Sequence, residues 1–369
     1  MTTLTAAGQS NGAFRNGGPP NAQPKITVRS LYKIFGDDPQ SVLPHVLEGM
    51  GKEELLEKHG HVLGLADINL DIAEGELFVV MGLSGSGKST LIRHFNRLIE
   101  PTSGSITVDG EDVVGYSKQE LAKFRSEKVS MVFQRFGLFP HRTVMENTGF
   151  GLEVQGRPKD EIREAALKWI DRVGLKGYED YFPGQLSGGM QQRVGLARAL
   201  ATDSEVMLMD EAFSALDPLI RTDMQDLLLE LQGQLKKTII FITHDLDEAL
   251  KLGDHIAILK DGVVVQRGDT QNVILKPEDA YIEEFVKDIN RARVIQARSV
   301  MTDVDAATPD SGPTVMAGEN LEAVLAKLDG DPDGTVLVER KGKVVGELSA
   351  RTVLETLRPT EVTEAEKQP

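Results

Sequence analysis

The sequence predicts an α/β fold, in which a large domain with a sheet core is followed by a smaller α/β module. Short apolar segments alternate with helical segments over much of the chain, which is typical of a parallel sheet. One apolar segment, residues 76–82, runs directly into a glycine-rich loop and a helix. Another, residues 206–209, ends in two acidic residues. Because such folds bind ligands at the carboxyl ends of their strands, both junctions are candidate sites.

Composition limits the classes of function. The chain has 369 residues, of which 40% are hydrophobic and 27% charged, enough for one large domain and an appendage. A net charge of −16 argues against nucleic acid as the main partner. The absence of cysteine excludes disulfides and fits a reducing compartment. No apolar run approaches the roughly 20 residues that span a bilayer, so we expect any membrane role to depend on a partner.

The N-terminal part is predicted to begin with a disordered leader, residues 1–24, which lacks the apolar core of a signal peptide. A strand is expected at 25–35, followed by a polar, helix-biased insert at 37–60. The next strands are expected at 68–72 and 76–82. A helix is then expected at 88–99.

The rest of the chain divides at a break near residues 290–298. Before the break, a helix-rich stretch precedes strands at 206–209, 238–243 and 255–259, with a helix at 219–235. Trp169, on the apolar stripe of a helix, is expected in the core. The predicted divisions are a leader (1–24), a main domain (25–290) with a helical subdomain (about 143–202), a small module (299–358) and a charged tail (359–369).

The glycine-rich loop is the first candidate site, because residues 82–90 match G-x-x-x-x-G-K-[ST]. Glycines let consecutive backbone N–H groups converge on phosphate, and the following helix directs its positive end to the same point. Lys88 adds a charge for the β and γ phosphates, and the Ser89 hydroxyl is suited to Mg²⁺. The expected ATP-binding residues of this loop are Gly82, Ser84, Gly85, Ser86, Gly87, Lys88, Ser89 and Thr90.

The second candidate is the acidic pair at the end of the 206–209 strand. Asp210 is expected to hold Mg²⁺ or one of its waters, and Glu211 to polarise the attacking water as a general base. Acidic residues at a strand end are often only solvated or capping groups. The glycine loop elsewhere in the chain favours the catalytic interpretation.

A third candidate is the loop at 186–191, where Ser187, Gly188 and Gly189 lead into a helix that contains Gln191. Such a loop provides another helix N-terminus for phosphate, although many Ser-Gly-Gly loops only cap their own helix.

Three single positions accompany these motifs. Gln134 follows a strand and could reach the Mg²⁺ or the attacking water, and His244 follows a strand and could hold the γ-phosphate. Phe35 could stack on adenine, with Tyr32 as a rival for that role. Taken singly, these residues are also explained as a surface glutamine, a helix-capping histidine and a core aromatic.

In their order along the chain, the motifs resemble those of ABC ATPases one for one. They are Phe35, the loop 82–90, Gln134, the signature-like loop 186–191, Asp210 with Glu211, the segment 214–217 that ends at Asp217, and His244. Stretches including FVVMGLSGSGKSTLIRHFNRLIEPTSG, LSGGMQQRVGLARALA and LMDEAFSALDPLIRTDMQDLLLELQ, and the insert before them, closely resemble the ATPase subunit of glycine betaine/proline uptake systems over about residues 25–290.

The resemblance implies an ATPase at the cytoplasmic face of the plasma membrane that drives integral-membrane permease subunits served by a solute-binding protein. Each ATP would lie between the glycine loop of one subunit and the signature-like loop of the other in a homodimer. Gln134 and the segment after it would pass the nucleotide state to the permease. The implied catalytic residues are Glu211, His244, Gln134 and Lys88; Ser89, Gln134 and Asp210 would serve the metal; and Ser187, Gly188, Gly189, Gln191 and Asp217 would complete the ATP site.

The C-terminal module departs from the family pattern. Relatives often carry a tandem pair of CBS modules that sense ionic strength or a nucleotide, whereas residues 299–358 suffice for about one repeat. A regulatory role and a stabilising role in dimerisation both remain open. The solute is also open, because glycine betaine, proline, choline, carnitine and trimethylamine N-oxide all suit this family.

Three other classes of protein fit the sequence less well. A soluble ABC ATPase of DNA repair or translation would have a long coiled coil or two cassettes, and the charge of −16 disfavours it. A small-molecule kinase does not explain the signature-like loop. A nucleotide-gated scaffold without activity would not need Lys88, Glu211 and His244 together.

Overall fold

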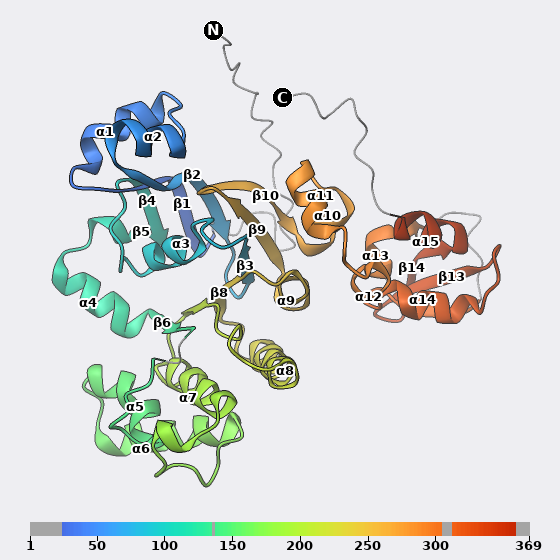
Figure 1. Cartoon of the computed structure of the whole chain (residues 1–369). Coiled ribbons are helices and arrows are strands. Elements are labelled where there is room, and N and C mark those ends of the chain that lie inside the picture. The colour runs from blue at the N-terminus through green and yellow to red at the C-terminus, as the bar shows by residue number, and fades with distance from the viewer. Residues whose placement is uncertain (1–23, 135–136, 305–311, 359–369) are drawn as a thin grey trace.

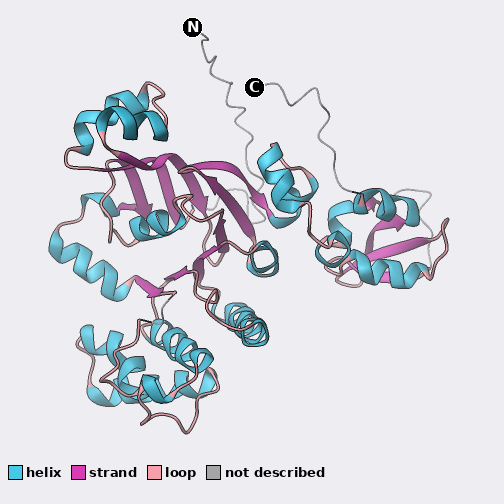
Figure 2. Cartoon of the chain, in the orientation of Figure 1, coloured by secondary structure: helices cyan, strands magenta, loops and turns pink. Residues whose placement is uncertain are grey.

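The computed structural model describes residues 24–134, 137–304 and 312–358. The predicted leader, apart from Pro24, and the predicted charged tail lie outside the described residues. Within the described part, the predicted α/β fold is confirmed, with three sheets and their covering helices (Figures 1 and 2). No helix in these ranges is both long enough and apolar enough to cross a membrane.

The central sheet carries the candidate site. Its strand order is β10-β9-β3-β8-β7-β6, with β9, β3, β8, β7 and β6 mutually parallel and β10 antiparallel at the edge. The parallel part therefore directs the carboxyl ends of β3, β7 and β8 to one edge of the sheet. The bounds are β3 Leu77–Met81, β6 Val129–Val132, β7 Val206–Asp210, β8 Thr238–Thr243, β9 His255–Lys260 and β10 Val263–Asp269.

Both faces of the central strands are buried, which explains why they appear in the sequence as continuous apolar runs. Along β3, Leu77, Val79 and Met81 point into one core. Phe78 and Val80 point into the core on the opposite face. Two separate cores therefore hold the sheet edge at which the motifs meet.

A second, antiparallel sheet covers one of these cores, with the order β2-β1-β4-β5. Its strand β2 is longer than the predicted 68–72 because it pairs with most of β1. The helix after the glycine loop, α3 (Lys88–Phe95), is shorter than predicted, since Arg97 adopts a left-handed backbone with φ of 52°. The other bounds are β1 Ile26–Phe35, β2 Val62–Ile72, β4 Ser103–Val108, β5 Glu111–Asp112 and α4 Lys118–Glu127.

The polar insert forms two helices, α1 (Pro39–Leu47) and α2 (Lys52–His59), beside the end of the second sheet (Figure 1). Asp38 caps α1, and Gly60 ends α2 in the left-handed region at φ 67°. A small core fixes both helices to β1 and β2; it consists of Ile34, Val42, Val46, Leu55 and Leu63.

Three helices form a separate layer below the central sheet in Figure 1: α5 (Val144–Val154), α6 (Lys159–Arg172) and α7 (Gly188–Ala201). A capping box begins α5, where Thr143 accepts from the backbone N–H of Glu146 and the Glu146 carboxylate accepts from that of Thr143. Trp169 is 6% exposed in the main core, as predicted from its place on the apolar stripe.

The C-terminal residues form a four-stranded sheet of order β11-β14-β13-β12 with helices against it. Its core includes Val336, Val338 and Leu348, and it extends to Ile274 of α10 in the main domain. Gln271 joins the two parts, donating to the carbonyl of Val294 and accepting from the N–H of Gln296. The bounds are α8 Pro218–Leu235, α9 Leu246–Leu252, α10 Thr270–Leu275, α11 Ala280–Val286, α12 Arg291–Val294, α13 Ala297–Val300, β11 Thr302–Asp303, β12 Thr314–Met316, α14 Leu321–Leu328, β13 Thr335–Arg340, β14 Lys343–Ser349 and α15 Ala350–Leu357.

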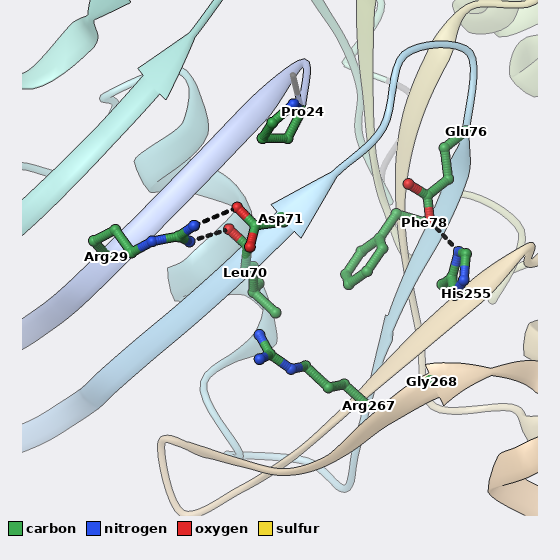
Figure 3. Close-up of a pocket in the computed structure, with 9 residues that line it drawn as sticks. All are labelled: Pro24, Arg29, Leu70, Asp71, Glu76, Phe78, His255, Arg267 and Gly268. Atoms are coloured by element: carbon green, nitrogen blue, oxygen red, sulfur yellow. Dashed lines mark hydrogen bonds and ion pairs between the residues drawn. The ribbon is translucent and has the colours of Figure 1, made fainter. Parts of the chain in front are cut away.

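The buried carboxylate of Glu76, the residue before β3, contacts His255 of β9. Both residues line a cavity of 230 Å³ to which the two main sheets contribute (Figure 3). Glu76 accepts from His255 Nδ1 at 2.6 Å and from the backbone N–H of Ala73 at 2.6 Å. The hydrogen bond to Glu76 raises the pKa of His255 above its ordinary value. On the other side of the cavity, Arg29 donates to Asp71 at 2.6 Å.

We expect Glu76→Gln to destabilise the protein in a pH-dependent way. Because the pKa of folded His255 is raised, its pairing contributes fully below the unfolded histidine pKa, about 6.5, and is lost as pH rises through the folded value. Urea unfolding should show a loss of about 1 kcal/mol at pH 6 and a smaller loss at pH 9. Asp71→Asn is the matched control, because its arginine partner does not titrate in this range. An equal loss of unfolding free energy for Glu76→Gln at pH 6 and pH 9 would show that the interaction of Glu76 does not depend on the charge of His255, contrary to this prediction.

Candidate functional site

The glycine-rich loop leaves β3 and enters α3 at the sheet edge described above. Gly82 and Gly87 have φ of 150° and 105°, in the range that only glycine adopts readily. A Cβ at Gly82 would lie 2.2 Å from the Leu259 carbonyl oxygen, and one at Gly87 would lie 2.8 Å from that of Gly64. Both glycines are therefore required for the loop to pass between neighbouring strands. The Ser86 hydroxyl is buried and has no hydrogen-bond partner among the residues that the structure describes.

Lys88 lies across the loop that precedes it. Its ammonium donates to the carbonyls of Gly82 at 2.8 Å and Leu83 at 3.0 Å. The side chain is 4% exposed, and this burial lowers its pKa, while the carboxylates of Glu211 and Asp210 act in the opposite direction. Among the described residues this buried cation contacts carbonyl oxygens and a distant carboxylate, so it is well placed to bind an anion.

Ser89 and Asp210 come together from different elements. The Ser89 hydroxyl, in the first turn of α3, donates to Asp210 Oδ1 at 2.9 Å, and Asp210 ends β7. Arg93 approaches the other carboxylate oxygen at 3.5 Å. The two hard oxygen groups beside a phosphate loop are the ligand types that Mg²⁺ takes in proteins.

Glu211 turns away from Asp210 because its backbone enters the left-handed region, with φ of 46°. This conformation costs a non-glycine residue roughly 1 kcal/mol or more. It is held by hydrogen bonds from the Glu211 N–H to Ile242 and from the Ser214 hydroxyl to the Glu211 carbonyl. This backbone conformation separates the two carboxylates. Only that of Asp210 lies beside Ser89, the other candidate group for Mg²⁺.

Three of the predicted catalytic side chains surround the Glu211 carboxylate. Gln134 donates to it at 3.3 Å, and His244 Nδ1 lies 3.4 Å from the same oxygen, Oε2. Lys88 Nζ lies 3.8 Å from the other oxygen, Oε1. Glu211 is 18% exposed and His244 56%, so the carboxylate lies at an opening that water can enter. The residues Arg135 and Phe136 after Gln134 lie outside the described ranges.

One cavity of 300 Å³ unites most of the predicted residues of the phosphate site. Ser84, Gly85, Gly87, Lys88, Ser89, Thr90 and Glu211 line one part of it. Phe35, a residue that is 40% exposed, lines another part, and the Lys33 ammonium lies 5.0 Å from its ring centroid. Tyr32, the rival for the aromatic role, packs instead against the core that fixes α1 and α2.

The same cavity includes four residues that sequence reasoning missed: Lys52, Val62, Leu63 and Gly64. Gly64 is adjacent to Phe35, since a Cβ there would lie 2.7 Å from the ring. No local motif marks these positions, because they reach the cavity through the pairing of β2 with β1 and through the fold of the insert.

The remaining predicted residues lie elsewhere in the single chain. Among the described residues that line the cavity, none comes from the loop 186–191 or from Asp217. Ser187 caps α7 by accepting from the N–H of Met190 at 3.3 Å, and Asp217 caps α8 by accepting from that of Ile220 at 3.1 Å. Gly189 fits closely against α8, where a Cβ would lie 2.6 Å from Ile220. One chain therefore presents two separate halves, a phosphate loop with its carboxylates and a glycine-containing helix N-terminus.

The geometry suits hydrolysis of a phosphoanhydride. The loop and Lys88 can hold a phosphate chain, while Ser89 and Asp210 offer oxygen ligands for the Mg²⁺ that accompanies a nucleotide. A bound Mg²⁺ would neutralise developing charge on the phosphates. Glu211, at the opening beside Gln134 and His244, is free of Asp210 and can accept a proton from water.

Comparison with known proteins identifies the family to which the chain is similar. Residues 65–214 match the model of the ABC transporter family. The glycine betaine transport ATP-binding protein OpuAA of Bacillus subtilis is 51% identical over 291 residues, covering 79% of this chain and 70% of the relative. The glycine betaine/proline betaine transport system ATP-binding protein ProV of Escherichia coli is 47% identical, covering 88% of this chain and 80% of the relative.

A trimethylamine N-oxide transport system ATP-binding protein of Ruegeria pomeroyi is 46% identical, covering 90% of this chain and 97% of the relative. Among solved structures, a dimeric ATP-binding cassette in a post-hydrolysis state, bound to ADP and phosphate, is 32% identical with a TM-score of 0.56. The matched region covers 66% of this chain and 98% of the cassette's chain. These findings confirm the predicted ABC ATPase fold, and the chain belongs to the family of ABC transporter ATP-binding proteins that includes those of glycine betaine transport.

Proposed function

We propose that this chain is the ATP-hydrolysing subunit of an importer for a compatible solute or quaternary amine, and that it powers transport through a partner permease. The observation that carries the proposal is the Glu211 carboxylate, held apart from Asp210 and facing Gln134, His244 and Lys88. The solute class is supported by relatives named for glycine betaine, proline betaine, carnitine and trimethylamine N-oxide transport.

In the proposed reaction, the loop 82–90 and Lys88 bind the phosphates of ATP, and Phe35 stacks on its base. Glu211 takes the proton of the attacking water, His244 holds the γ-phosphate, and Gln134 orients the water and responds to the partner. Ser89, Gln134 and Asp210 are the proposed residues for Mg²⁺. Glu211 lines the cavity, and Gln134 and His244 lie beside its carboxylate, which supports these roles.

The second half of the proposed ATP site comes from another copy of the chain. Ser187, Gly188, Gly189 and Gln191 form a helix N-terminus that does not reach the cavity of its own chain. Two copies arranged about a two-fold axis would each supply what the other lacks, with ATP between them. Support comes from the related cassette, whose solved structure is dimeric and holds ADP and phosphate.

The permease and its solute-binding protein are proposed partners at the cytoplasmic face of the plasma membrane. The relatives are described as ATP-binding components of transport systems, which supports this arrangement. Gln134 belongs to the Glu211 cluster, and the described residues from Gly137 onward lead to α5, so this part of the chain is suited to carry the nucleotide state to a permease loop.

Glu211→Gln should retain ATP binding while turnover falls by about two orders of magnitude, the usual scale for loss of a general base. Because ATP then stays intact between two subunits, MgATP should also trap a dimer, measured by light scattering. Glu230→Gln, a matched change on an exposed carboxylate of α8, should hydrolyse ATP like the parent. Parent-like turnover by Glu211→Gln would exclude this residue as the base.

Mixing two inactive variants tests the shared site. A heterodimer of Ser187→Arg and Lys88→Ala subunits has one site with both lesions and one site with neither. ATPase activity should therefore reappear in the mixture, whereas each variant alone should stay inactive. Absence of recovery in a heterodimer demonstrated by differential tagging would contradict a composite site.

We further propose that the C-terminal module, a single CBS-like repeat over 299–358, is regulatory, since the predicted phosphate-handling residues all lie before Asp245. Its core extends to Ile274 of α10, and Gln271 of the same helix bonds to the segment that leads into the module. These contacts give the module a route to the main domain.

Truncation after Asn290 should leave a folded protein that hydrolyses ATP but should alter the response of reconstituted transport to ionic strength. Gln271→Ala is the milder companion, because it removes only the two hydrogen bonds to Val294 and Gln296, in the segment that leads into the module. Loss of ATPase activity in both variants, with folding intact by circular dichroism, would contradict the division of roles. If transport by both variants responds to ionic strength like the parent, the module has a structural role and not a regulatory one.

A further inference from the structure

The insert between β1 and β2 contributes a wall to the nucleotide cavity. Lys52, the first residue of α2, lines the cavity together with Phe35, Val62 and the glycine loop. The insert is not a loose extension, because Leu55 of α2 is fully buried against Ile34 and Leu63 of the neighbouring strands. The position of Lys52 beside the phosphate loop is therefore fixed by the core of the protein.

The charge of Lys52 is unfavourable for its own helix. A helix N-terminus carries partial positive charge, so anions stabilise it and cations do not. The other charges of α2 follow this rule, with Glu53 and Glu54 in the first turn and Lys58 in the last. The capping residue, Gly51, provides no side-chain acceptor. Lys52 thus adds a cation at the end of α2 that already repels cations, and that end faces the cavity.

The ion pair that Lys52 makes in this structure is weak. Its ammonium lies 3.9 Å from Asp261 Oδ1, beyond hydrogen-bond distance, and the two side chains are 39% and 68% exposed. Exposed pairs of this kind contribute little to stability. Lys52 is therefore available for a stronger acceptor.

The turn that bears Asp261 belongs to the rim of the phosphate loop. The N–H of Gly262 donates to the Ser86 carbonyl at 3.0 Å, and the Gly262 carbonyl accepts from Ala66 at 2.8 Å. The Lys52 ammonium accordingly lies near this turn, on a wall of the cavity that the glycine loop and Phe35 also line.

We propose that Lys52 is a nucleotide-binding residue, whose ammonium leaves Asp261 and donates to oxygen atoms of the ATP phosphate chain. The inference rests on the proposed function, because its ligand is the ATP of that site. In this proposal Lys88 supplies charge from the glycine loop and Lys52 supplies it from the insert. In a chain with a net charge of −16, a second local cation also favours the approach of an anionic nucleotide.

The test is nucleotide affinity of the full chain, measured by calorimetry with a non-hydrolysable ATP analogue and Mg²⁺. Lys52→Glu should weaken binding by about tenfold at low salt, and by less at 0.5 M salt because the contact is partly exposed. Lys52→Arg should bind within about twofold of the parent, since it keeps the charge. Lys58→Glu is the matched control, with the same charge change on the same helix at a position 62% exposed and paired with Glu54; it should bind like the parent.

Parent-like affinity for Lys52→Glu would overturn the inference. An equal loss of affinity for Lys52→Glu and Lys58→Glu would also overturn it, because the effect would then be a long-range effect of charge and not a contact of Lys52. A loss that high salt does not reduce would also overturn it. Lys88→Ala separates this failure from that of the proposed function. If Lys88→Ala loses binding while Lys52→Glu does not, only the role of Lys52 is wrong. If Lys88→Ala binds like the parent, the phosphate site itself is wrong.

Discussion

The site depends above all on the register of the parallel strands β3, β8 and β7. Met81 lies beside Thr243, and Asp210 lies beside Ile242, so the three strands end at the same level. Their next residues are the glycine loop, His244 and Glu211, which come from distant parts of the chain. Burial on both faces prevents a slip of one residue, because a slip would exchange the side chains that fill the two cores.

Backbone conformation then decides which chemistry each group performs. Asp210 and Glu211 are adjacent in sequence, and an extended backbone alone would not determine which of them reaches the phosphate loop. The left-handed conformation of Glu211 gives Asp210 to Ser89 and leaves Glu211 facing Gln134 and His244. A local strain of roughly 1 kcal/mol or more is therefore offset by hydrogen bonds from neighbouring elements.

The arrangement of the single chain supports the proposed pairing of two copies. Its phosphate cavity opens to solvent, while the helix N-terminus at Ser187 lies outside that cavity. The insert closes part of the cavity from the side of Phe35, through α2 and the start of β2. The nucleotide site is thus bounded by three regions with different origins: the central sheet, the insert and, in the proposed dimer, a second copy.

The sequence by itself determined the α/β class, the phosphate loop, the acidic strand end and the likeness to ABC ATPases, because each depends on a local pattern of residues. Glycines at fixed spacing, an apolar run before Asp210 and the capping Ser187 are all readable without a partner. Only the tertiary structure decided that Glu211 rather than Asp210 faces His244, that Phe35 rather than Tyr32 lines the cavity, and that Lys52 joins it. These outcomes depend on strand pairing and on packing between residues far apart in the chain, and no local motif encodes such long-range contacts.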